Sequence, residues 1–127
     1  MNYRQAAASY GIPGNVSVVM LAADTAKDLV PARTNYTFHI QRLTYVPCIV
    51  AAQAITVRSK TTTTAIYALI PASQAIPYWF DFGPEGLAIT AAEILEAVPA
   101  AAGPQGRFRV EGYYKLTTAI ATHAANQ

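Results

Sequence analysis

The chain has few of the residues that build catalytic or metal centres. Its 127 residues include one cysteine, Cys48, and two histidines, His39 and His123. A single cysteine excludes an internal disulfide and a cysteine-built zinc site, and it fits synthesis in a reducing cytoplasm. A metal-binding jelly roll needs two or three histidines with a carboxylate at strand spacing, which this sequence does not offer. We therefore expect no metal and no cofactor.

Charged side chains are also scarce, at 13% of the sequence against about 25% in typical soluble proteins. Much of the surface should then be neutral, and such surface in a small protein is often covered by a partner. The basic residues are scattered, and only "GRFRVEGYYK" approaches a cluster, with Glu111 among its cations. Nucleic-acid surfaces need clustered cations that follow the phosphates. We therefore expect assembly with other protein subunits and no nucleic-acid binding.

Long apolar runs are absent as well. Charged, polar or proline residues interrupt every stretch before it reaches the roughly 18 residues that a membrane-spanning helix needs. The first residues, "MNYRQAAASYGIPGN", lack the apolar core of a signal peptide. We expect no membrane association and no export through a signal peptide.

Catalytic motifs are incomplete. The tripeptide Asp81-Phe82-Gly83 occurs in protein kinases, but the glycine-rich loop, strand lysine and catalytic-loop aspartate that it needs are missing. No serine lies in a nucleophile elbow. Among the seven carboxylates, Glu85 and Glu93 are candidates for pairing across strands, and solvation or capping is the simpler interpretation. We therefore expect that the protein is not an enzyme.

Alternation of apolar and polar residues with period two is the dominant pattern, and it predicts strands that bury one face. In "YTFHIQRLTYV" the apolar set moves from even to odd positions near Arg42, which indicates a bulge or a strand passing between sheets. "NVSVVMLA" is less polar on its outer side, at Val19 and Leu21, so both its faces are expected to be covered. The clearest strand is "RFRVEGYYKL", with Phe108, Val110, Tyr114 and Leu116 on one face and Arg107, Arg109, Glu111 and Lys115 on the other.

Turn residues separate these strands. Thr61 to Thr64 read as a hairpin tip, and "GPEG" suits a type I turn, with Asp81 pointing outward just before it. Residues 90–99 carry a capping-box spacing that favours a helix, whereas a sandwich favours a strand there, and we favour the strand. About eight strands are expected, near residues 15–22, 36–46, 53–60, 64–70, 76–82, 86–90, 93–98 and 106–117.

This density of strands predicts an all-β fold, an antiparallel β-sandwich of jelly-roll type. We expect one domain over residues 1–127, with an extended N-terminal arm over 1–14, the sandwich over 15–117 and a frayed tail over 118–127. The arm and the stretch "DTAKDLVPARTN" show no strand period. Because an isolated short helix is marginal, the arm is expected to lean on a neighbouring subunit.

Aromatic residues are the remaining candidates for function, since tyrosine and tryptophan bury area while keeping a polar group. Trp79 faces away from Phe80 and Phe82, so it lies either in a second buried layer or at a contact with another subunit. Tyr113 is out of phase in the same way. The candidate interface residues are Trp79, Tyr113, Arg107, Arg109, Tyr3 and Tyr10.

The run from "FHIQRLTYV" through "AITVRSK", "YWFDFGPEGLAIT", "AAEILEAV" and "GRFRVEGYYK" resembles small β-sandwich proteins of tailed-bacteriophage virions, the capsid decoration, cement and head-fibre base proteins. In those proteins an aromatic strand is followed by a P-x-G-L-x-L-T segment with a Gly-Glu or Ala-Glu pair, then by a loop rich in Ala and Gly, and the last strand ends in Gly-Tyr-Tyr. The "PEGL" turn and Gly112-Tyr113-Tyr114 match as structural positions. Ala92 stands before Glu93 where a glycine is frequent.

The resemblance implies a structural protein that sits as a homotrimer on the outside of a capsid. It would be made in the host cytoplasm and would join subunits of the major capsid protein at three-fold or quasi-three-fold positions, with no catalytic residue. The alternative is a carbohydrate- or receptor-binding sandwich of a phage tail or fibre. In that case Trp79, Tyr113 and Tyr114 would be the stacking platforms.

Overall fold

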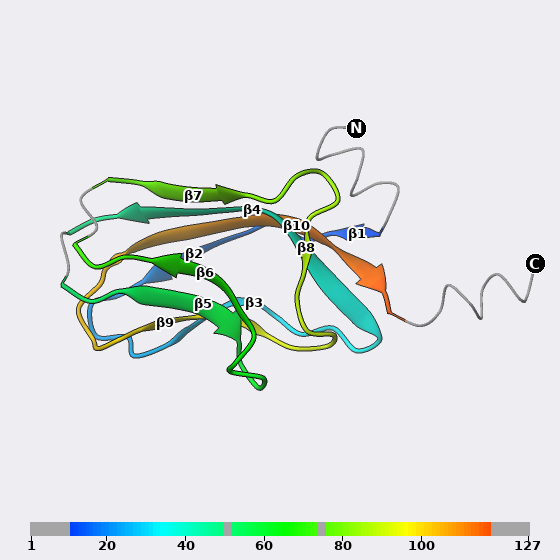
Figure 1. The fold of residues 1–127 in the computed structure, drawn as a ribbon, viewed down its shortest axis with the longest axis horizontal. Helices are drawn as coiled ribbons and strands as arrows, with labels where there is room; N and C mark the ends of the chain where they lie inside the picture. Colours follow the sequence, from blue (N-terminus) through cyan, green and yellow to red (C-terminus); the bar gives the residue numbers. More distant parts are fainter. Residues whose placement is uncertain (1–10, 50–51, 74–75, 118–127) are drawn as a thin grey trace, which may run out of the picture.

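The computed structural model describes residues 11–49, 52–73 and 76–117, and these residues form ten strands and no helix. The strands make two antiparallel sheets that pack face to face as a β-sandwich (Figure 1). The predicted all-β antiparallel sandwich is thereby confirmed, whereas the jelly-roll type stays a prediction. The predicted arm, where it covers residues 1–10, and the predicted tail, 118–127, lie outside the described residues.

The first sheet has two long central strands with short strands along both sides. β10 and β4 pair with each other over their whole length; β1 and β2 follow one another along β10, and β7 and β8 along β4. The bounds are β1 Ile12–Pro13, β2 Val16–Met20, β4 Tyr36–Pro47, β7 Tyr78–Asp81, β8 Leu87–Ala88 and β10 Gly106–Leu116.

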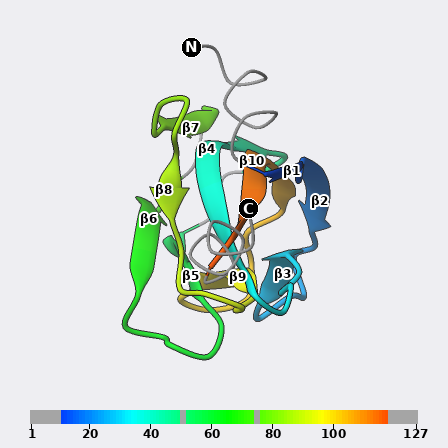
Figure 2. The ribbon, with the colours of Figure 1, turned by 90° about the vertical axis from the view of Figure 1, so that its right-hand side faces the viewer.

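The second sheet is smaller, in the order β3-β9-β5-β6, with β3 and β6 at its opposite edges (Figure 2). Its bounds are β3 Lys27–Val30, β5 Ile55–Ser59, β6 Ile66–Ile70 and β9 Leu95–Pro99.

The core lies between the two sheets, where alternate side chains of each strand meet. Burying one large aliphatic or aromatic side chain stabilises the fold by about 1.5–3 kcal/mol, so this layer supplies most of the driving force for folding. The fully buried large side chains are Tyr45, Phe108, Met20, Ile40, Leu43, Ile55, Ile70, Leu95, Val30 and Val57, together with Tyr113 outside this layer.

The eight predicted strands are all present, in places shorter by a few residues. The strand predicted within 90–99 is confirmed as β9, and no helix forms there. Glu93 does not close a capping box: its carboxylate accepts hydrogen bonds from the backbone and side chain of Thr62, at the hairpin tip between β5 and β6. That tip and the turn from Gly83 to Gly86 are also confirmed.

Two predictions of missing strand structure were wrong. Lys27–Val30, inside "DTAKDLVPARTN", forms β3, whose alternation is broken because Leu29 and Val30 are both buried at an irregularity in its pairing with β9. Ile12 and Pro13, inside the predicted arm, form β1 beside the end of β10. Neither segment is long enough or regular enough to show a period of two.

The predicted change of facing near Arg42 is a β-bulge. Glu111 pairs with Arg42, but the next residue, Gly112, pairs with Ile40, so Gln41 is the extra residue on β4. The Gln41 side chain is buried, and its amide donates a hydrogen bond to the carbonyl of Pro84. The bulge thus shifts by one residue which side chains of β4 point outward, while the side chains of β10 alternate without interruption.

Candidate interaction surface

The outer face of the first sheet brings together three of the six predicted interface residues. Because Phe108 and Val110 point into the core, the pleat of β10 sends Arg107 and Arg109 to the opposite side. We call this surface the arginine-tryptophan face. It consists of Ser17, Val19, Arg42, Thr44, Val46, Trp79, Asp81, Arg107, Arg109 and Glu111.

Trp79 lies at the edge of this face, on β7. It is opposite Thr44, which in turn is opposite Arg109. Its side chain is 68% exposed, the highest value among the exposed large hydrophobic residues in the described part of the chain. Of the two alternatives for Trp79, the second buried layer is therefore wrong, and its ring is open to contact from outside.

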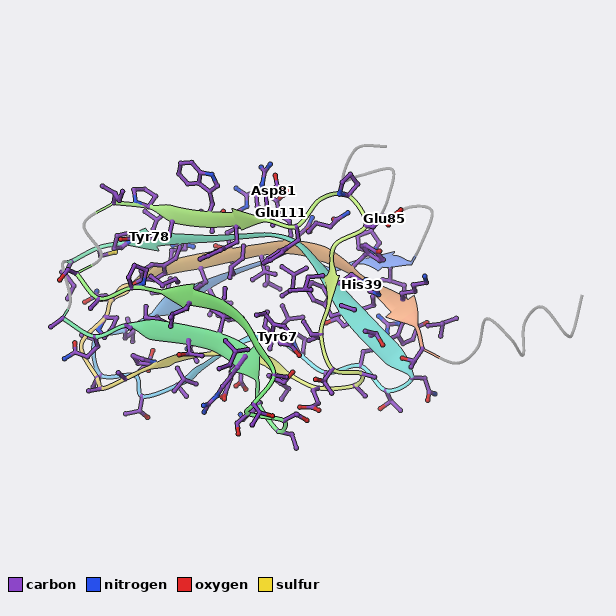
Figure 3. The ribbon with its side chains drawn as sticks, in the orientation of Figure 1. His39, Tyr67, Tyr78, Asp81, Glu85 and Glu111 are labelled. Carbon is purple, nitrogen blue, oxygen red and sulfur yellow. The ribbon has the colours of Figure 1, made fainter. Side chains whose placement is uncertain are left out.

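The three arginines of the face differ in their partners. Arg42 forms an ion pair with Asp81 at 3.2 Å, and Arg109 lies 3.6 Å from a carboxylate oxygen of Glu111. Figure 3 shows Asp81 and Glu111 on this outer side of the sheet. Such exposed pairs contribute about 0–1 kcal/mol to folding stability, but they do neutralise the local charge.

Arg107 has a neutral partner instead. Its guanidinium donates a hydrogen bond of 3.0 Å to the Ser17 hydroxyl, and within the described ranges no carboxylate lies within ion-pair distance of it. Its direct neighbours in the register are apolar: Val19 on β2 and Val46 on β4, which are 39% and 46% exposed. Arg107 is thus a cation set between two exposed valines.

Asp81, predicted to point outward before a turn, does so. Besides pairing with Arg42, its carboxylate accepts a hydrogen bond of 3.0 Å from the backbone N–H of Gly83, which has a positive φ of 83°. The aspartate therefore closes the turn into the Gly83–Gly86 segment and holds the end of β7 against β4.

Tyr113 lies on the same side of β10 but beyond the bulge, and it is 2% exposed. Its ring stacks on His39, with centroids 4.9 Å apart and planes 8° from parallel, and its hydroxyl donates a hydrogen bond of 2.6 Å to the carbonyl of Glu85. Tyr113 therefore connects β10 to β4 and to the turn at Glu85, and its ring is not exposed on the surface. Tyr3 and Tyr10 lie outside the described residues.

A pocket of about 240 Å³ opens beside this stack, lined by His39, Glu85, Gly86, Tyr113 and Lys115. Burial and then the positive charge of Lys115 lower the pKa of His39, and a backbone interaction with Glu85 opposes them. The imidazole is therefore neutral at neutral pH. Across residues 11–49, 52–73 and 76–117, no three His, Cys, Asp or Glu side chains are grouped to hold a metal ion.

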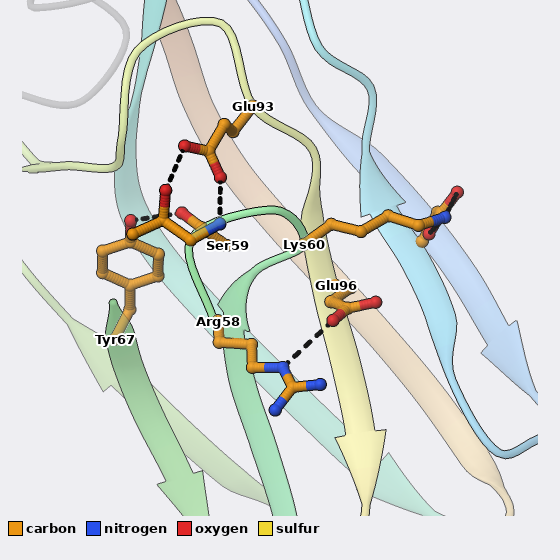
Figure 4. A network of polar contacts seen from close by, with 8 residues as sticks. Arg58, Ser59, Lys60, Tyr67, Glu93 and Glu96 are labelled. Atoms are coloured by element: carbon orange, nitrogen blue, oxygen red, sulfur yellow. Dashed lines mark hydrogen bonds and ion pairs between the residues drawn. The ribbon is translucent and has the colours of Figure 1, made fainter. Parts of the chain in front are cut away.

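The outer face of the second sheet carries a network of polar contacts that joins its strands (Figure 4). Arg58 on β5 forms a 3.0 Å ion pair with Glu96 on β9, whose side chain is 6% exposed. Lys60, just after β5, pairs with Asp28 on β3 at 3.0 Å. Sequence reasoning did not identify this network, because alternation shows that a side chain faces outward but not which partner it meets.

Sequence reasoning also did not single out Val46 as a surface residue of interest. The available signal was an apolar residue on the polar side of an alternating strand, as was noted for Val19. Apolar side chains on the outward face are the features that alternation flags as unusual.

Among the described residues, no helix is both long and apolar enough to cross a membrane.

No protein-family model and no curated protein sequence matches the chain. Solved structures that share its fold include the following two. One is a chain of the acid-stable capsid structure of Helicobacter pylori bacteriophage KHP30, with a TM-score of 0.59, 13% identity, and coverage of 86% of this chain and 91% of that chain. The other comes from the disulfide-linked pili that form Bacillus endospore appendages, with a TM-score of 0.53, 16% identity, and coverage of 83% and 88%. At these identities the likeness is one of fold alone.

Proposed function

We propose that this chain is a structural protein of a phage virion that decorates the outside of the capsid and stabilises it by binding the lattice of the major capsid protein. The observation that carries the proposal is the shared fold with a chain of a phage capsid structure, which extends over nearly the whole of both chains. The sequence resemblance to capsid decoration proteins points the same way. The role is one of binding, without catalysis.

The surface of the sandwich suits a protein with more than one neighbour. The first sheet exposes Trp79, Val19 and Val46 on its outer face. The second sheet ends in β6, an edge strand on which Ile66 and Leu69 are 58% and 59% exposed. Two separate apolar surfaces allow one contact with the lattice and another with a neighbouring copy in a homotrimer.

The proposal is tested by measuring mass and binding together. Light scattering of the purified protein should give three times the 13.6 kDa of one chain. Capsids that lack the protein should take it up, and their melting temperature should rise because a ligand that binds only the assembled shell stabilises it. A strict monomer that does not bind capsids would contradict the proposal.

A carbohydrate-binding module of a phage tail or fibre is the second candidate, favoured by the exposure of Trp79. A flat aromatic ring that is 68% exposed can stack against a sugar. A glycan array should then show saturable binding that Trp79→Ala abolishes with the fold intact. Ile66→Ala, at an exposed apolar residue of the other sheet, is the control and should bind as the wild type does.

A further inference from the structure

We propose that the arginine-tryptophan face is the surface that docks on the capsid, and that it fits an acidic protein surface which sets a carboxylate against Arg107. This inference rests on the proposed function and adds to it which surface is used and what chemistry the partner presents.

The first step concerns charge. Arg42 and Arg109 already have carboxylates nearby, at 3.2 Å and 3.6 Å, whereas the hydrogen-bond partner of Arg107 is the neutral hydroxyl of Ser17. A partner that covers this face removes water from Arg107, and burying an arginine is costly unless an anion pairs with it. A carboxylate is the protein group that meets the guanidinium with two parallel hydrogen bonds.

The second step concerns what surrounds that cation. Val19 and Val46 stand on either side of Arg107, and both are partly exposed. In protein interfaces the residues that dominate affinity are tryptophan, tyrosine and arginine, surrounded by contacts that exclude water. Arg107 between two valines, with Trp79 on the same face, has that composition.

The third step sets aside other occupants. Glu111 and Asp81 lie on either side of Arg42 on the same face, where they would repel a line of phosphates. A second copy that used the same face would bring together two Arg107 side chains, neither of which has an ion-pair partner among the described residues. The face carries three arginines and two carboxylates, so two copies of it would also repel each other. A different protein with an acidic surface is therefore the partner that the charges favour.

The test compares two charge reversals in the full chain. Purified wild-type protein, Arg107→Glu and Lys60→Glu are titrated onto capsids that lack the protein, after each variant is shown to melt like the wild type. Lys60, on the opposite sheet, undergoes the same change of charge, and its pairing with Asp28 is exposed. Arg107→Glu should weaken binding about tenfold or more, as loss of a central interface residue does, and Lys60→Glu should change it by less than about twofold.

Each result decides a separate question. If the wild type binds and Arg107→Glu binds equally well, the docking face is wrong and the proposed function stands. If the wild type does not bind capsids, both fail. A photo-crosslinking residue placed at Thr44 should join the chain to a capsid-protein segment that contains Asp or Glu. Crosslinks between two copies of this chain would overturn the choice of partner.

Discussion

Gly112 on β10, which lies next to the register shift at the β4 bulge, offers a direct test of how the two central strands fit together. A Cβ atom built there would lie 2.2 Å from the carbonyl oxygen of His39 and 2.5 Å from Cζ of Phe38. Both contacts are far below van der Waals distance, and one of them is with the backbone of the neighbouring strand. Gly112→Ala should therefore force β4 and β10 apart at the bulge.

The expected cost follows from this geometry. Overpacking a core costs about 1–3 kcal/mol, and we expect about 3 kcal/mol here because a backbone group cannot rotate away. That is a large part of the roughly 5–15 kcal/mol by which a domain is stable. With a urea m-value of about 1.5 kcal/mol per M, the unfolding midpoint should fall by about 2 M.

A double-mutant cycle assigns the cost to the contact. Phe38→Leu removes the ring atom that the new methyl group would strike, so Gly112→Ala should cost about 1 kcal/mol less in that background. Glu111→Ala, at the partly exposed position next to it, is the control and should shift the midpoint only slightly. An unchanged midpoint in Gly112→Ala, with the same m-value, would refute the reasoning.

Three further predictions concern the turn before β9 and its neighbours. Ala92 has a φ of 56°, where alanine is strained by about 1–2 kcal/mol, so Ala92→Gly should raise the thermal midpoint, offset in part by about 0.5–1 kcal/mol of chain entropy; a lower midpoint would contradict this. The Tyr67 hydroxyl hydrogen-bonds with the hydroxyl of buried Ser59 and accepts a hydrogen bond from the backbone N–H of Thr90. Tyr67→Phe should therefore lower the free energy of unfolding by about 1–3 kcal/mol in chemical denaturation, because it leaves these groups without a partner. Tyr67→Leu should lower it at least as much, and a smaller loss in Tyr67→Leu than in Tyr67→Phe would contradict this. Hydrogen bonds from the hairpin tip lower the pKa of Glu93 below 4.5, so its contribution is complete above pH 4.5 and is lost as the pH falls through the lower folded value; Glu93→Gln should flatten stability against pH in that acid range, and an identical pH profile would speak against it.

Much of the fold could be predicted from local patterns because a strand shows its facing in its own residues. In β10 the alternation of Phe108 and Val110 with Arg107 and Arg109 identified the buried and the outer side, and both are confirmed. The bulge at Gln41 was also visible, since inserting one residue shifts the phase of the apolar set. β3 could not be found in this way because four residues with two adjacent buried side chains have no usable period.

The candidate surface was predictable only in part. The sequence placed Arg107, Arg109 and Trp79 outward on their strands, because the pleat is a local property of the backbone. Which side chains meet across strands was decided by the register of β2, β10, β4 and β7, which depends on contacts between segments far apart in the chain. That register sets Val19 and Val46 beside Arg107, leaves Trp79 exposed to solvent and buries Tyr113 against His39. The period of a single strand shows only that a side chain points outward. What covers that side chain is decided by tertiary packing.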